Sequence, residues 1–237
     1  MPMAASFICE AAATMRLAPT AILFDWDNTL ANGWAAIQAG LNAAFREFAL
    51  PEWNMEQVLA NTRRSMAESF PAIFGEQWHR ARDVFYAAVR EQHLEVLRPM
   101  PGTAPMLQLA VTIAPLAIVS NKQGPMLRDE VAHLRWDGFF RASVGAGDAS
   151  ADKPSAAPLH MALRACAVPA GPEAWYVGDT ALDMQAARAA GMTAVLLGDA
   201  SHDGGIAACN PDMQFADAAA LAAHLVTLDK RSHMTNA

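Results

Sequence analysis

The sequence Ala21-Ile22-Leu23-Phe24-Asp25-Trp26-Asp27-Asn28-Thr29 passes from four apolar residues directly into a cluster of acids. A short apolar run of this kind is typical of a parallel strand that is buried on both faces. Asp25 and Asp27 lie two residues apart, so their side chains point the same way if the backbone stays extended. Because two such carboxylates repel each other, the pair predicts a bound divalent metal or one protonated acid. The alternative is a turn and capping cluster, since Asp and Asn favour turns.

More short apolar runs follow the same pattern, each ending in Ser, Asn, Gly or Asp: Leu116–Val119, Ala142–Val144, Trp175–Val177 and Thr193–Leu197. Helical patterns lie between these runs, roughly at 125–134, 158–167 and 182–190. This alternation predicts an α/β fold built on a doubly wound parallel sheet. In such sheets, ligands bind at the carboxyl ends of the strands. The polar residues that follow each run are therefore the candidate site.

About ninety residues separate the first two apolar runs, far more than a crossover helix needs. Within this stretch Ile37, Leu41 and Phe45 recur at helical spacing. The later segment Arg98-Pro99-Met100-Pro101-Gly102 contains helix breakers and is expected to form a return hinge. We therefore expect an inserted all-helical domain at 33–98, an α/β core at 19–32 and 99–237, and an N-terminal extension at 1–18.

Composition restricts the class of protein. The 237 residues are 53% hydrophobic, which excludes a disordered chain, and the net charge of −7 argues against a nucleic-acid partner. No apolar run is long enough to span a bilayer, so we expect no membrane partner. The three cysteines form no Cys-x-x-Cys pair, which fits a reducing cytoplasm. The segment Met1–Ala18 lacks a basic start, so we expect no signal peptide, and Met15 is an alternative start of translation.

Three further strand ends carry chemically useful residues: Ser120-Asn121-Lys122, Asp152-Lys153-Pro154 and Gly178-Asp179-Thr180-Ala181-Leu182-Asp183. The first offers a hydroxyl and backbone N–H groups at the start of a predicted helix, which suits an anion but is also an ordinary helix cap. Lys153 is one of three lysines in the chain and can supply a positive charge to a phosphate. Asp179 and Asp183 lie one helical turn apart. Oxygen ligands of this kind select a hard cation such as Mg²⁺.

Together these motifs resemble the haloacid dehalogenase superfamily of phosphohydrolases. Its first motif, Asp-x-Asp-x-Thr, is matched by Asp25, Asp27 and Thr29, and its remaining motifs are matched in order by Ser120, Lys153, and Gly178-Asp179 with Asp183. The resemblance extends from about Ala21 to Leu228. The insertion resembles the helical cap of the phosphoglycolate phosphatase type. Asn28 stands where many members have Gly, a mild change because Asn tolerates a left-handed backbone.

The resemblance implies a Mg²⁺-dependent phosphatase. In it, Asp25 would attack phosphorus and form an aspartyl-phosphate, and Asp27 would first protonate the leaving group and then activate water. Thr29 would orient Asp27. Mg²⁺ would lie between Asp25, the backbone carbonyl of Asp27 and Asp179, with Asp183 acting nearby or through water. The phosphoryl oxygens would be held by Ser120, Lys153 and the backbone N–H groups of Trp26, Asp27 and Asn121.

Other readings of the same motifs differ in what they require. A dehalogenase would not keep Asp27, and a phosphonoacetaldehyde-type hydrolase needs a cap lysine, whereas residues 31–100 contain none. A sugar-phosphate mutase uses the same core residues and stays the alternative within the superfamily. From another class, a phosphoryl-accepting switch needs no cap, and a binding module without catalysis has no need to keep the acids and Lys153 together.

The predicted cap points to a small phosphorylated metabolite as substrate, because a cap cannot enclose a protein. By resemblance, phosphoglycolate is the leading candidate. Arg63 and Arg64 lie where the cap of this family meets its substrate, and they could hold a carboxylate or a second phosphate. The alternative is that both arginines lie on a solvated helix face.

Overall fold

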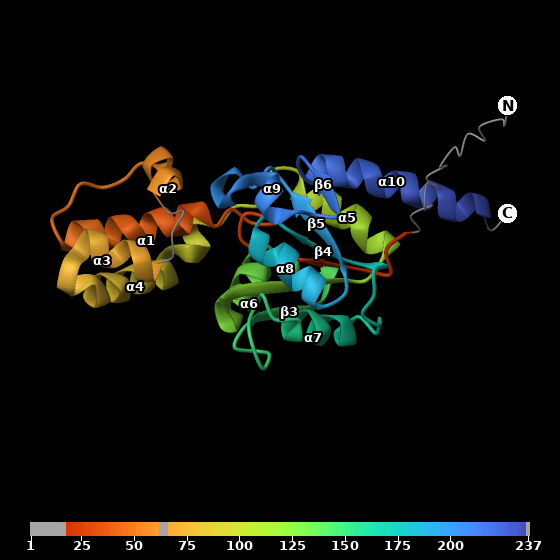
Figure 1. The fold of residues 1–237 in the computed structure, drawn as a ribbon, viewed down its shortest axis with the longest axis horizontal. Helices are drawn as coiled ribbons and strands as arrows, with labels where there is room; N and C mark the ends of the chain where they lie inside the picture. Colours follow the sequence, from red (N-terminus) through yellow and green to blue (C-terminus); the bar gives the residue numbers. More distant parts are fainter. Residues whose placement is uncertain (1–17, 62–65, 236–237) are drawn as a thin grey trace, which may run out of the picture.

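The computed structural model describes residues 18–61 and 66–235. The predicted extension, apart from Ala18, and both cap arginines, Arg63 and Arg64, lie outside the described residues. Figure 1 shows an α/β body that contains the sheet and, at one side of it, a group of helices drawn from orange to yellow. No helix in the described part of the chain is both long and apolar enough to cross a membrane.

A parallel sheet forms the centre of the α/β body and confirms the predicted doubly wound fold. Its strands are β1 (Ala21–Phe24), β2 (Leu116–Gln123), β3 (Phe140–Ala146), β4 (Ala174–Gly178), β5 (Thr193–Leu197) and β6 (Met213–Phe215). They lie in the order β3-β2-β1-β4-β5-β6, and every neighbouring pair is parallel. The apolar first strand thus occupies the middle of the sheet, where both its faces are buried.

Side-chain alternation along β1 divides the core into two layers. Ile22 and Phe24 pack with α5 (Thr103–Ile113), α6 (Gly124–His133) and α10 (Ala218–Thr235). Ala21 and Leu23 pack on the other face with α7 (Ala157–Ala165) and α8 (Ala181–Ala189), next to the short α9 (Gly205–Cys209). Three short 3₁₀ turns complete the described elements: η1 (Gly75–Gln77), η2 (Asp137–Phe139) and η3 (Ser201–Asp203).

The inserted segment is helical and has a core of its own. It comprises α1 (Trp34–Glu47), α2 (Met55–Asn61), α3 (Met66–Phe74) and α4 (Trp78–Val96). Leu41 and Phe45 from α1 pack there against Phe70 and Phe85. The two connections between this segment and the core lie side by side. The N–H of Asn32 in the first connection donates to the carbonyl of Arg98 in the second at 2.8 Å. The domain limits at residues 33 and 98 stay a prediction.

The end of β2 differs from the sequence prediction. The apolar run ends at Val119, yet the strand continues through Ser120-Asn121-Lys122 to Gln123, and helix α6 begins only at Gly124. The interpretation that Ser120 and Asn121 open a helix is therefore wrong. The physical reason is pairing with β3, where Gln123 lies opposite Ala146 after a register shift. The edge strand β6 was not predicted either, because its three residues show too little pattern to identify a strand.

Close packing of α1 on α4 yields a stability prediction for the cap. A Cβ atom at Gly40 would lie 2.7 Å from both the Phe85 ring and the Val89 side chain. We expect Gly40→Val to lower the free energy of unfolding by about 1–3 kcal/mol, because the two helices must separate. Thermal unfolding measures the effect, and Gly138→Val is the control, since a Cβ there meets no atom within 4 Å. Equal midpoints for the two variants would contradict the prediction.

Candidate active site

Three acids from different elements meet at the carboxyl edge of the sheet. Asp25 directly follows β1, Asp179 directly follows β4, and Asp183 lies in the first turn of α8. Each is almost fully buried, and one oxygen from each lies within 4.8 Å of the others. Asp179 Oδ2 is buried and makes no hydrogen bond, and His202 Nε2 lies 3.2 Å away, where it forms an ion pair when the imidazole is protonated. The arrangement is suited to a hard cation, since all its ligand atoms are oxygen.

Lys153 balances part of this negative charge. Its Nζ lies 2.6 Å from Asp25 Oδ1 and 2.7 Å from Asp183 Oδ1, and it also donates to the hydroxyl of Tyr176 at 2.9 Å. The side chain of Asn121 fixes the backbone of this lysine by accepting from Lys153 N–H at 3.0 Å and donating to its carbonyl at 3.1 Å. Lys153 therefore bridges two acids that are far apart in sequence.

Burial and charge shift the titration of this group. Burial raises the pKa of Asp25 to about 8, against the opposing effect of Lys153, and the charges of Asp183 and Asp179 add to the rise. Burial also raises the pKa of Asp179. Although burial alone would lower the pKa of Lys153, the charges of Asp183 and Asp25 raise it well above its usual value. Lys153 therefore stays charged, but its single positive charge does not fully offset the negative charge of the buried acids.

Asp183 is held rigidly by its own helix. Thr180 is the N-cap of α8, and its hydroxyl and N–H both donate to Asp183 Oδ2, at 2.6 and 3.1 Å. Lys153 and Tyr176 occupy the other oxygen. Gly178 leaves the space for this packing, because a Cβ there would lie 2.4 Å from Asp183. Because both oxygens are already engaged, Asp183 is better suited to support a bound cation than to be its main ligand.

The two acids of the first motif contact different lysines. After Phe24 the chain leaves the strand and turns, with Asn28 at a φ of 62°, in the left-handed region that Asn tolerates. Asp25 contacts Lys153, whereas Asp27 Oδ1 lies 2.6 Å from Lys122 Nζ. The expected common direction of the two side chains required an extended backbone, and the strand ends at Phe24, so that condition is not met; both acids nevertheless line the same cleft.

Thr29 has a different partner from the one expected. Its hydroxyl donates to Asp179 Oδ1 at 3.2 Å, so the expectation that it orients Asp27 is not met. The turn explains the difference, because the N–H of Leu30 donates to the carbonyl of Trp26 at 2.9 Å and brings Thr29 back to the sheet edge. Ser120 is buried at the end of the apolar part of β2, where its Oγ accepts from the N–H of Lys122.

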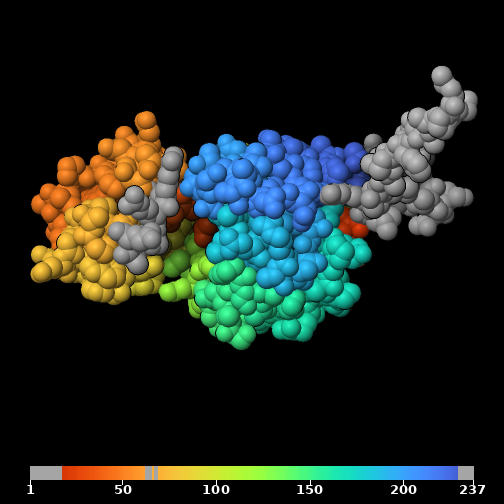
Figure 2. All heavy atoms as spheres, in the orientation of Figure 1, coloured from red at the N-terminus to blue at the C-terminus, as the bar shows by residue number. Residues whose placement is uncertain are grey.

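A cleft of about 600 Å³ lies between these residues and the helical segment. Figure 2 shows the junction of the two bodies as a waist in the molecule. The core side of the cleft includes Asp25, Asp27, Ser120, Asn121, Lys153, Asp179 and Asp183. The cap side consists of Ala36, Ile37, Phe85, Tyr86, Val89 and Arg90. Among the described cap residues that line it, Arg90 is therefore the one cation.

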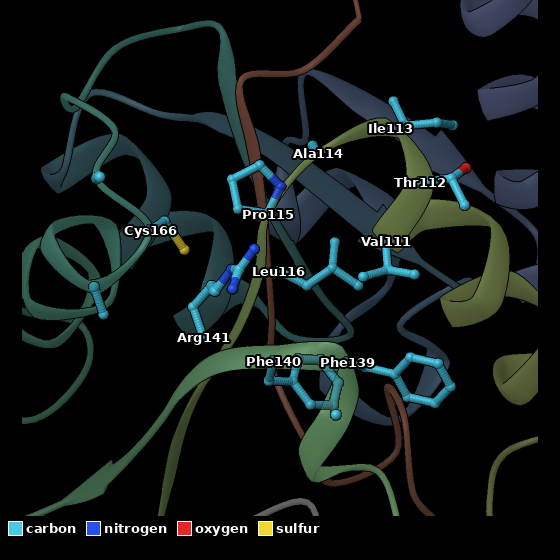
Figure 3. Close-up of a pocket in the computed structure, with 13 residues that line it drawn as sticks. Val111, Thr112, Ile113, Ala114, Pro115, Leu116, Phe139, Phe140, Arg141 and Cys166 are labelled. Atoms are coloured by element: carbon cyan, nitrogen blue, oxygen red, sulfur yellow. The ribbon is translucent and has the colours of Figure 1, made fainter.

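A second hollow of about 650 Å³ lies at the opposite edge, where β2 and β3 begin. Figure 3 shows Arg141 beside Cys166 in its wall. Burial raises the pKa of the Cys166 thiol, so this sulfur stays protonated and is a poor nucleophile. Ligands of doubly wound sheets bind at the carboxyl ends of the strands. The cleft with the acids is therefore the candidate active site.

Several residues of the site were not singled out by sequence reasoning: Lys122, Glu130, Tyr176, Arg90 and His202. Only Lys122 carried a signal, since it directly follows Ser120-Asn121 in a chain with three lysines. The others stand in strand, helix or turn patterns where nothing distinguishes them from structural residues.

Removing Lys153 should destabilise the metal-free protein. We expect Lys153→Met to cost about 3–5 kcal/mol in EDTA, because buried acids lose their cation. The loss should grow from pH 5 to pH 8. Lys153 opposes the rise that burial causes in the pKa of Asp25, so its removal raises that pKa further. An acid whose folded pKa lies above its unfolded value loses stability contribution as pH rises, and this loss is larger in the variant. Chemical unfolding at both pH values measures the effect, and a pH-independent loss would contradict the role of charge.

Comparison with known proteins supports the same assignment. A phosphoglycolate phosphatase of Pseudomonas syringae pv. tomato is 28% identical over 89% of this chain and 81% of its own length. A phosphoglycolate phosphatase of Pectobacterium atrosepticum is 29% identical over 73% of this chain and 78% of its own.

Among solved structures, a haloacid dehalogenase-like hydrolase from Streptococcus pneumoniae superposes with a TM-score of 0.74 at 21% identity, covering 87% of this chain and 98% of that one. A predicted phosphoglycolate phosphatase from Haemophilus somnus gives 0.71 at 22% identity, covering 85% and 95%. The profile of the family described as haloacid dehalogenase-like hydrolase matches residues 22–197, from the first strand to the fifth. This match confirms the resemblance drawn from the motifs, and the chain belongs to the haloacid dehalogenase-like hydrolases.

Proposed function

We propose that the protein is a Mg²⁺-dependent phosphatase that hydrolyses a small phosphomonoester through an aspartyl-phosphate on Asp25. The observation that carries this proposal is the contact of Asp25 Oδ1 with Lys153 at 2.6 Å, beside Asp179 and Asp183, in a cleft beneath the helical cap. A carboxylate in that position can attack a phosphoryl group whose oxygens a lysine also binds. The relatives named phosphoglycolate phosphatase support the same reaction class.

The residues present suit Mg²⁺. The donor set is oxygen only, Asp179 Oδ2 is buried without a hydrogen bond, and burial raises the pKa of both Asp25 and Asp179. Asp25, Asp179 and the backbone carbonyl of Asp27 would hold the ion, with Asp183 next to it. When bound, the ion would offset the repulsion between the substrate phosphate and the carboxylates.

In the proposed reaction, Asp27 gives up one proton in the first step and regains one in the second. Asp25 attacks phosphorus as Asp27 gives its proton to the oxygen of the leaving alcohol. Water then attacks the phosphorus of the aspartyl-phosphate, Asp27 takes up one of its protons, and the bond from Asp25 to phosphorus breaks. Ser120, charged Lys153 and the N–H groups of Trp26, Asp27 and Asn121 would hold the phosphoryl oxygens. Thr29 supports Asp179 in this scheme, through the hydrogen bond between them.

Two measurements on the purified protein test this function. We expect release of inorganic phosphate from p-nitrophenyl phosphate that stops in EDTA and returns with Mg²⁺. We also expect Asp25→Asn to lose turnover by well over 10-fold, or more than about 1.4 kcal/mol of barrier, because an amide is not a competent nucleophile. Full activity in EDTA, or a variant with a tenth of wild-type turnover, would contradict the proposal. A sugar-phosphate mutase would isomerise its substrate instead of releasing phosphate.

Phosphoglycolate is the leading substrate, and Arg90 is the described cap residue suited to its carboxylate. We expect Arg90→Ala to lower kcat/KM for phosphoglycolate about 10- to 150-fold, the equivalent of a charge-assisted hydrogen bond. The value for p-nitrophenyl phosphate, which has no second anion, should change little. Arg82→Ala is the matched control, because Arg82 lies on the same helix but pairs with Asp83 outside the cleft.

Equal losses for the two substrates would contradict recognition of a carboxylate by Arg90 and would indicate an effect on the cap itself. Arg63→Ala and Arg64→Ala belong in the same comparison, since the sequence makes these residues candidates for the same role.

A further inference from the structure

Glu130 is a buried carboxylate that the proposed chemistry does not use. It lies on α6 and is 1% exposed. Its Oε2 accepts from Trp26 Nε1 at 2.5 Å and from Lys122 Nζ at 2.6 Å, and its Oε1 lies 2.8 Å from His93 Nδ1 at the end of cap helix α4. A buried charge is costly unless it is paired and hydrogen-bonded. The partners of Glu130 come from three separate parts of the chain, so it anchors a network.

Lys122 links this anchor to the active site. Its Nζ lies 2.6 Å from Glu130 Oε2 and 2.6 Å from Asp27 Oδ1, and its side chain is 11% exposed. The two carboxylates pair with the ammonium group, which satisfies its charge although the side chain is mostly buried. Lysine has a long flexible stem. Contact with Glu130 removes that freedom and fixes where the ammonium group meets Asp27.

We propose that Lys122, anchored by Glu130, is a positioning residue that sets the orientation of the Asp27 carboxyl group for proton transfer. The inference rests on the proposed function of Asp27 as acid and base. Lys122 holds Oδ1, while no described residue forms a hydrogen bond with Oδ2. In this proposal Oδ2 is the oxygen that transfers the proton. An acid held in one orientation transfers its proton faster than one that rotates, because the productive geometry is already formed.

Lys122 itself transfers no proton in this scheme. Oδ2 of Asp27 gives its proton to the alkoxide as the ester bond breaks, and it regains one from the water that attacks the aspartyl-phosphate. The ammonium group stays protonated throughout. Its effect should therefore depend on how much each step needs Asp27. An alkyl phosphate needs a proton on its leaving oxygen, whereas p-nitrophenolate leaves without one.

The first measurement compares kcat/KM of Lys122→Met for phosphoglycolate and p-nitrophenyl phosphate. This parameter covers the steps up to release of the alcohol. We expect a loss of about 10- to 100-fold for the alkyl ester and less than about 3-fold for the aryl ester, because general acid catalysis acts on the first alone. Arg128→Met is the matched control, since Arg128 lies on α6 but pairs with Asp148 outside the cleft. That control should behave as the wild type.

A double-mutant cycle then asks whether Lys122 acts through Asp27. Turnover of p-nitrophenyl phosphate includes hydrolysis of the aspartyl-phosphate, which needs Asp27 as base. Lys122→Met should lower kcat in the wild type but have little further effect in Asp27→Asn, because the group that it positions is gone. Equal losses in both backgrounds would mean that Lys122 binds the phosphate directly, and they would overturn the proposal. An unchanged ratio of alkyl to aryl kcat/KM would also overturn it.

Glu130→Gln keeps the test decisive if Lys122→Met does not fold. A glutamine can still accept a hydrogen bond from Trp26, while Lys122 loses its charged anchor. We therefore expect kcat/KM to fall more for the alkyl ester than for the aryl ester again, but by a smaller factor than in Lys122→Met. A wild-type ratio in this variant would overturn the proposal. Wild-type protein that hydrolyses neither ester would instead overturn the proposed phosphatase function, and the inference with it, before any variant is compared.

Discussion

Charge balance among buried groups is the constraint on which the active site depends. Asp25, Asp179 and Asp183 are nearly excluded from water, and each raises the energy of the others when unpaired. Lys153 compensates by contacting two of them at once. It can do so because the sheet order brings the end of β1, the loop after β3 and the start of α8 to one edge. Packing and electrostatics are therefore satisfied by the same arrangement.

The chain separates its acids by means of two lysines. Lys153 contacts Asp25 and Asp183, while Lys122 contacts Asp27 and Glu130. The first-motif acids thus contact different cations, although they are two residues apart. This division suits a reaction in which one carboxylate attacks and the other transfers protons, because the two groups need different surroundings.

The helical cap contributes no acid to the described cleft wall. Its side of the cleft is mostly apolar, with Arg90 and Tyr86 as the larger polar residues. Since α1–α4 pack around a separate core, the cap residues can vary while the acids at the sheet edge stay in place. The adjacent entry and exit segments, joined between Asn32 and Arg98, connect this body to the core.

The local sequence pattern was sufficient to predict the five apolar strands and the helices between them, because buried parallel strands have a distinctive composition. It also identified Asp25, Lys153, Asp179 and Asp183 as candidates, since each follows a strand end and parallel strands end at one edge. It did not predict that β2 continues to Gln123, that Asp25 and Asp27 contact different lysines, or that Thr29 contacts Asp179. Glu130 shows why: a carboxylate on a helix looks solvated in sequence, and only the packing of Trp26, Lys122 and His93 around it makes it a buried anchor. The contact of Trp26 with Glu130 joins residues 104 positions apart, and no local pattern records it.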